Sequence, residues 1–180
     1  MSILKVNTIQ DKGGNTIISS DGSGSVSITG DVFTSKLFHI RQESSSGTQG
    51  GSATSGSWQT RTLDTIKTNE IGGSLSSNQF TLPSGTYFIS ASAPAQDVLA
   101  NRIKLYNITD SSDVMFGTNS YNDASNNGMR SFLSGRFTIA SSKTFEIQHR
   151  VVRTNNTFGY GIGNGFAVEV YTDALIWKVA

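Results

Sequence analysis

The chain has 180 residues, of which 36% are hydrophobic and 15% are charged. Its 14 Lys and Arg residues against 13 Asp and Glu give a formal net charge of +1, so it has no basic field of the kind that attracts nucleic acid. The absence of cysteine excludes a disulfide scaffold, a thiolate metal site and a thiol nucleophile.

The longest uninterrupted apolar run covers only residues 174–177. A membrane-spanning helix needs about 20 apolar residues, and a secretory signal needs an apolar run of roughly 7–15. We therefore expect no membrane insertion, and synthesis in the cytoplasm without a signal peptide.

Residues 1–35 are predicted to form a short β-rich stem or anchor. Strand-like pieces cover 3–9, 16–18 and 25–33, and Gly- and Asn-rich turns separate them. Three short strands cannot shield their own apolar side chains. Either the rest of the protomer or identical copies must cover them, with disorder as the alternative. The residues predicted for trimer packing and attachment are Ile3, Val6, Ile9, Ile17, Ile18, Val26, Ile28 and Phe33.

Residues 36–57 are predicted to be a Ser/Gly-rich linker with a possible first strand at 37–42. Within this range, 44–57 contain one Ala and no larger apolar residue. Such a composition favours a linker or a long surface loop.

Residues 58–180 are predicted to fold as a β-sandwich or jelly roll, because 15 of the 17 aromatic residues lie here and helical periodicity is absent. Apolar residues alternate on both sides of a short polar loop between 137 and 152, which predicts a hairpin. The segment 58–71 is interpreted as one or two strands. The other predicted strands are 79–82, 86–93, 101–108, 114–118, 131–135 and 166–179.

No metal or cofactor site is expected. His39 and His149 lie far apart and are interpreted as packed or surface residues rather than zinc ligands. The turn 110–113 offers only two carboxylates, too few for calcium. The glycines of 159–165 lack the spacing and the following helix of a nucleotide-binding loop, and are interpreted as a loop that enters the last strand.

Two loops are candidate recognition surfaces, because aromatic residues on loops are good binding anchors. The polar segment 119–130 carries Tyr121, Met129 and Arg130, and the glycine-rich run carries Tyr160. An ordinary sandwich loop of the same length is equally compatible with the first segment.

Several blocks resemble a jelly-roll domain widespread in tailed bacteriophages, which is itself similar to the tumour necrosis factor (TNF) and complement globular-head fold. These blocks are 76–95, 102–118, 131–151 and 168–179, and residues 4–24 resemble segments of phage tail-fibre and other virion proteins. The resemblance implies an all-β, homotrimeric TNF-like jelly roll over 58–180 that is a virion structural protein and not an enzyme.

The function expected from this resemblance is a trimeric tail-fibre or spike module on the virion. Residues 1–35 would bind other virion proteins, and the jelly roll would recognise a host-surface polysaccharide. The alternative is a trimeric capsid decoration, cement or head-fibre protein. A polysaccharide-degrading enzyme is a remote alternative, since Asp97, Glu146, Glu169 and Asp173 form no recognisable catalytic pair.

Overall fold

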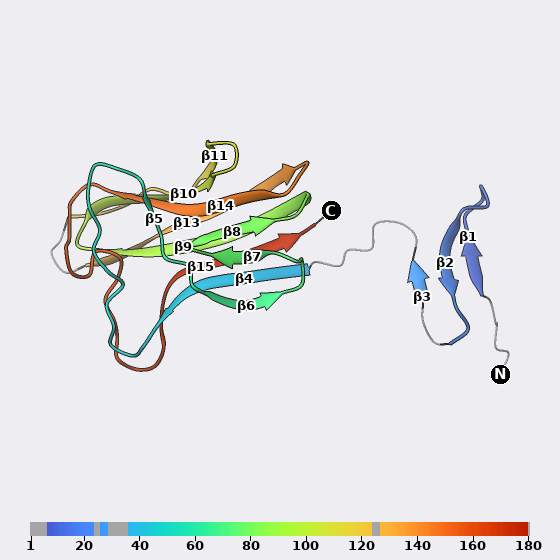
Figure 1. Ribbon diagram of the computed structural model, residues 1–180, viewed down its shortest axis with the longest axis horizontal. Coiled ribbons are helices and arrows are strands. Elements are labelled where there is room, and N and C mark those ends of the chain that lie inside the picture. The colour runs from blue at the N-terminus through green and yellow to red at the C-terminus, as the bar shows by residue number, and fades with distance from the viewer. Residues whose placement is uncertain (1–6, 24–25, 29–35, 124–126, 180) are drawn as a thin grey trace. The chain divides into compact units, whose positions relative to one another are not determined.

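The computed structural model describes residues 7–23, 26–28, 36–123 and 127–179, which form strands, turns and loops but no helix. The chain divides into two compact units, Met1–Thr34 and Ser35–Ala180 (Figure 1). No helix in the described ranges has the length and apolar character required to cross a bilayer.

The first unit contains a three-stranded antiparallel sheet of β1 (Thr8–Gln10), β2 (Thr16–Ser20) and β3 (Val26–Ile28), in that order. The turn between β1 and β2 forms because the Asp11 carboxylate accepts hydrogen bonds from the backbone N–H groups of Gly13 and Asn15. The pKa of Asp11 is lowered most by a hydrogen bond from the Asn15 side chain, and the backbone bonds lower it further.

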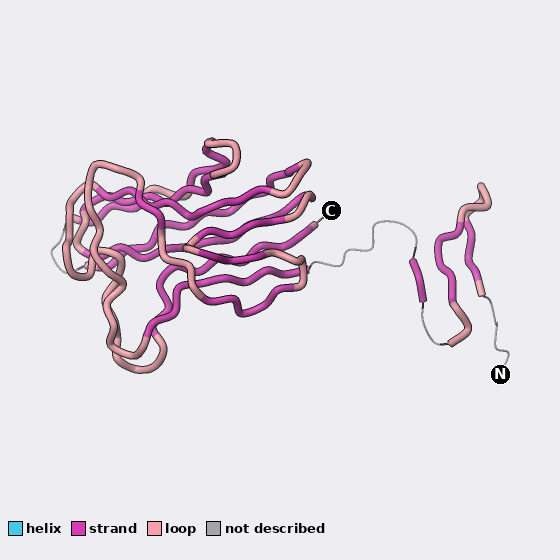
Figure 2. The backbone as a smooth tube through the Cα atoms, in the orientation of Figure 1, coloured by secondary structure: helices cyan, strands magenta, loops and turns pink. Residues whose placement is uncertain are grey.

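The second unit is a sandwich of two antiparallel sheets (Figure 2). The five-stranded sheet has the order β13-β9-β15-β4-β6. The seven-stranded sheet has the order β11-β10-β14-β8-β7, with β12 beside β10 and β5 beside β14. The strands are β4 (Lys36–Ser44), β5 (Gln59–Thr60), β6 (Thr65–Asn69), β7 (Ser74–Ser76), β8 (Gln79–Leu82), β9 (Gly85–Gln96), β10 (Leu99–Asn107), β11 (Ser112–Phe116), β12 (Ser120–Asn122), β13 (Gly128–Ile139), β14 (Lys143–Val151) and β15 (Glu169–Lys178).

The core lies between the two sheets and is held together by aromatic rings. Phe137 of the five-stranded sheet packs edge-on against Phe145 of the seven-stranded sheet, with ring centroids 5.5 Å apart. Phe145 also stacks on Phe80, and Phe137 on Tyr87, each pair at 5.7 Å. Contacts of this kind add about 0.5–1.5 kcal/mol per pair to the burial of the rings.

The hairpin predicted over 137–152 does not form. β13 pairs with β9, whereas β14 pairs with β10, β8 and β5 in the other sheet. The polar turn between them therefore crosses from one sheet to the other. The alternation correctly identified the inward-facing side chains, but an apolar face can point into the core from either sheet.

Residues 36–57, predicted as a linker, belong to the second unit. β4 is longer than the expected strand and pairs with both β15 and β6. The following loop, 45–58, is fixed by its own backbone: Gly50 N–H donates to Gly161 O, and Ala53 exchanges two hydrogen bonds with Asn155. Ala53 is fully buried, so one small side chain and the backbone bonds suffice to hold the loop in place.

Candidate binding surfaces

Long loops gather at one end of the sandwich, where β9 and β14 finish and β10, β13 and β15 begin (Figure 1). β4 begins at Lys36 and β15 ends at Lys178 at the opposite end. All four predicted contact residues lie at or next to the loop end, but the structure does not bring them to a single site.

Met129 and Arg130 line a first pocket, with a volume of about 520 Å³, between the end of β9 and the starts of β13 and β15. The loop 152–168 closes it on one side through Ile162 and Asn164. Pro94, Ile162 and Tyr171 supply apolar wall, and Gln96 and Arg130 supply polar groups. The pocket thus combines apolar surface with a few polar groups, as ligand-binding pockets do.

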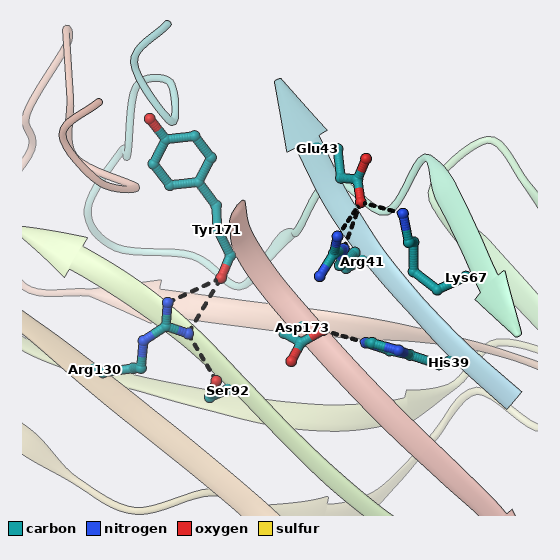
Figure 3. Close-up of polar contacts among 8 residues, drawn as sticks. All are labelled: His39, Arg41, Glu43, Lys67, Ser92, Arg130, Tyr171 and Asp173. Atoms are coloured by element: carbon teal, nitrogen blue, oxygen red, sulfur yellow. Dashed lines mark hydrogen bonds and ion pairs between the residues drawn. The ribbon is translucent and has the colours of Figure 1, made fainter. Parts of the chain in front are cut away.

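Arg130 is attached to the sheet by its guanidinium group (Figure 3). Nη1 donates to the Ser92 hydroxyl at 2.7 Å, and both terminal nitrogens donate to the Tyr171 carbonyl at 3.2 and 3.3 Å. Burial lowers the pKa of Arg130, and the negative charge of Asp173 opposes that shift. The guanidinium is therefore a fixed positive group at the edge of the first pocket.

Glu169 joins two of the loops that form this end. Its Oε1 accepts hydrogen bonds from the backbone N–H groups of Gly47 and Gly165, at 2.9 and 2.7 Å. These bonds, together with one from the Asn164 backbone, lower the pKa of Glu169. As predicted, the glycine-rich run is a loop that leads into β15. At Gly161 a glycine is required, because φ is +128° and a Cβ would lie 2.6 Å from the Tyr171 ring.

Tyr160 is packed below the loop surface. Its ring lies 4.0 Å from the Arg61 guanidinium carbon and stacks on His149 at 5.5 Å, and its hydroxyl donates to Gln59 Oε1 at 2.7 Å. Tyr121 is 69% exposed. Of the two tyrosines, only Tyr121 presents most of its side chain to solvent.

A buried polar cluster of Arg61, His149, Asn101 and Thr172 lies beside Tyr160, and sequence reasoning did not identify it. Arg61 is fully buried; its Nε donates to Thr172 Oγ1 at 2.9 Å and Nη2 to Tyr160 O at 3.3 Å. Burial, more than any charge, lowers the pKa of Arg61 to about 9. The backbone N–H of Arg61 donates to Ile147 O, which places the side chain in the interior beside β14.

His149 belongs to the same cluster, and its Nε2 lies 2.9 Å from Asn101 Oδ1. Because an amide oxygen only accepts, Nε2 carries the proton and Nδ1 of the neutral ring is an acceptor. Burial and then the charge of Arg61 hold the pKa of His149 well below 6.5. His149 is thus a packed histidine, one of the two interpretations offered by the sequence.

A second pocket, with a volume of about 400 Å³, lies at the same end but on the seven-stranded sheet. Tyr121 lines it together with Trp58, Arg102, Arg150 and Val152. Trp58 contacts Phe116 with ring centroids 6.0 Å apart, and the Lys104 ammonium lies 4.5 Å from the Trp58 ring centroid. These contacts fix the Trp58 ring beside the pocket.

The outward face of the five-stranded sheet is largely open. Phe132 is 55% and Phe88 39% exposed, and Phe88 packs against Trp177 at 6.1 Å. Some of the charged groups on this side are paired (Figure 3): His39 Nε2 lies 2.7 Å from Asp173 Oδ1. Glu43 binds both Arg41 and Lys67, and these bonds lower its pKa.

The acidic residues considered for catalysis or metal binding have separate partners. Asp97 pairs with Arg153 and Asp173 with His39, while Glu146 accepts hydrogen bonds from Thr60 and Gln148. In the turn 110–113 the two carboxylates bind Lys143 and Lys104. Across the described ranges, no three His, Asp or Glu side chains converge as a metal site would require.

In the first unit, three of the predicted packing residues are exposed: Ile9 by 46%, Ile17 by 39% and Val26 by 61%. Ile18 is half-buried. Ile3, Val6 and Phe33 lie outside the described residues, as does the side chain of Ile28, whose backbone belongs to β3.

Comparison with solved structures identifies the architecture. An Eiger TNF from S. frugiperda aligns with a TM-score of 0.51 and 8% identity over 81% of this chain and 93% of that one. The globular domain of a zebrafish complement 1qA protein aligns at 0.49, with 14% identity over 82% and 98% of the two chains. Murine APRIL at pH 5.0 gives 0.48 and 10% identity over 81% and 99%.

The chain therefore has the all-β TNF-like jelly-roll fold, as predicted from the sequence. No family model matches the sequence, and a search of curated proteins finds no match. At these identities the likeness establishes the fold alone, and the function must be argued from the surfaces described above.

Proposed function

We propose that this protein is a homotrimeric virion structural protein of the tail-fibre or spike type that attaches through residues 1–35 and recognises a host-surface polysaccharide with the loop end of the jelly roll. The observation that supports this most is the position of the two pockets. Both lie at the end of the sandwich opposite Lys36, the first residue of β4, which is where residues 1–35 join the jelly roll in the sequence.

Trimer formation is supported by the open face of the five-stranded sheet. In its central rows Ser90 of β9 lies opposite Ser134 of β13, and Ser92 of β9 lies opposite the exposed Phe132. A surface with small polar residues and exposed rings can pack on copies of itself. Three copies would also multiply weak saccharide contacts.

Attachment through the first unit is supported by its exposed apolar side chains. A sheet of three strands with three, five and three residues is at best marginal in water when it stands alone. The exposed Ile9, Ile17 and Val26 are better covered by sister chains or by another virion protein, which would also pair the strand edges.

The test is adsorption. Purified protein should label host cells and block phage adsorption, and a variant that lacks residues 1–34 should bind cells but fail to join the virion. Sedimentation should give a trimer; a single 19.2 kDa species at micromolar concentration would refute the assembly.

Two further measurements separate the alternative functions. A copy number in the virion near that of the major capsid protein, without cell binding, would instead identify a decoration or cement protein. Release of reducing ends from host polysaccharide would overturn the proposal that the protein has no enzymatic activity.

A further inference from the structure

Two arginines face each other directly across neighbouring strands of the seven-stranded sheet. Arg102 of β10 is the register partner of Arg150 of β14, and both line the second pocket. Directly opposed residues have Cβ atoms about 4.5–5.5 Å apart, and like charges at that distance destabilise a sheet. An anion bound between the two guanidinium groups would remove this repulsion.

The described residues do not supply that anion. Arg102 donates from Nε to Gly117 O at 2.7 Å, and its guanidinium carbon lies 4.8 Å from the Phe116 ring centroid. Its terminal nitrogens have no hydrogen bond or ion pair with another described residue. The side chain of Arg150 is exposed and has no hydrogen bond or ion pair with another described residue. The carboxylate of Asp113, on the neighbouring β11, pairs with Lys104 at 2.5 Å.

The described residues that line the second pocket include no acidic residue. Its walls are aromatic and aliphatic: Trp58, the exposed Tyr121 and Val152, which is 62% exposed. Asn119 at the pocket rim supplies an amide group. Unpaired arginines, aromatic rings and amide groups together fit a ligand that has a carboxylate, an apolar face and hydroxyl groups.

We propose that the second pocket binds a carboxylate-bearing sugar, such as a uronic acid unit within an acidic polysaccharide. Arg102 and Arg150 hold the carboxylate, because the planar guanidinium matches carboxylate geometry. Trp58 and Tyr121 cover the apolar face of the sugar ring, and Asn119 and Ser120 face its hydroxyl groups from the pocket rim. This assignment rests on the proposed function, since it specifies the polysaccharide that the loop end recognises.

The fluorescence of Trp58 provides a direct test. The chain has two tryptophans, so the Trp177→Phe variant leaves Trp58 as the sole reporter. The probes are a tetrasaccharide that contains glucuronic acid, the matched tetrasaccharide with glucose in its place, and a sulfated form of the neutral one. Arg150→Gln removes a pocket charge, and Lys143→Gln, at the other end of the same strand, removes one charge outside the pocket.

The glucuronic acid probe should change Trp58 fluorescence saturably, and the neutral probe should bind at least tenfold more weakly. In the Arg150→Gln variant the Kd for the acidic probe should rise about tenfold, which is the effect expected when one charge-assisted hydrogen bond is lost. Lys143→Gln should leave the Kd unchanged, and added salt should weaken binding because the pocket is open to solvent.

Equal affinity for the acidic and neutral probes would overturn the assignment, as would tighter binding of the sulfated probe or no effect of Arg150→Gln. A cell-adsorption assay separates this result from the proposed function. If the protein labels host cells and neither Arg150→Gln nor the acidic probe reduces labelling, the sugar assignment fails and the proposed function stands. If Trp58 responds as expected and no host cell is labelled, the assignment stands and the proposed function fails.

Discussion

Acidification should destabilise the second unit through His149, which is buried and neutral. In the unfolded chain this histidine has an ordinary pKa near 6.5, whereas burial and Arg61 hold the native pKa well below that value. Below pH 6.5 the unfolded state therefore binds a proton that the native state does not, so stability falls as the pH falls. Each pH unit is worth about 1.36 kcal/mol, so at about pH 5 the loss amounts to about 2 kcal/mol while native His149 stays neutral.

The assay is urea unfolding of the wild type and of His149→Gln, followed by tryptophan fluorescence at about pH 8 and about pH 5. Both tryptophans, Trp58 and Trp177, lie in the second unit, so the signal reports on that unit. The free-energy difference between the two proteins should shift by about 2 kcal/mol in favour of the variant at the lower pH. The same shift should appear when both proteins carry His39→Gln. A difference that does not change with pH would refute the burial argument.

Three further perturbations follow from the packing. Phe145→Ala should lower the free energy of unfolding by about 3–5 kcal/mol, because it leaves a cavity between the two sheets. Phe132→Ala should change that free energy by only about 0.5 kcal/mol, yet it should weaken self-association measured by sedimentation. Gly161→Ala should lower it by about 1–3 kcal/mol, since it adds a Cβ in a left-handed conformation against Tyr171; urea unfolding at neutral pH measures all three.

The sequence was sufficient for the fold class and for many strands. The strand predicted at 79–82 is β8, with the same bounds, because its alternation is flanked by a Pro-Ser-Gly turn. The partners of the strands could not be predicted in the same way. Phe137 and Phe145 both face the core, but only the ladders with β9 and β10 place them in different sheets.

At the loop end, too, the sequence could not predict which residues the strand pairing brings together. Met129 and Arg130 share a pocket because they are adjacent on β13, whereas Tyr121 lies on β12 beside β10 and lines another. Composition left a linker and a long surface loop as alternatives for 44–57; the structure has a loop, in which backbone hydrogen bonds and the buried Ala53 do what large apolar side chains do elsewhere. A pattern of residue types carries little information about bonds made by glycine backbone.

The net charge of +1 conceals a local excess of positive charge at the loop end. At this end the carboxylate of Asp97 is held by Arg153, and Glu169 is bound by backbone N–H groups. Four arginines near this end, by contrast, form no ion pair with any described carboxylate: Arg61, Arg102, Arg130 and Arg150. The net charge of the whole chain excludes an extended basic surface of the kind that binds nucleic acid. It does not exclude a local anion-binding site formed by two side chains. Such a site exists only once the strand register has set Arg102 opposite Arg150, so no reading of composition could have predicted it.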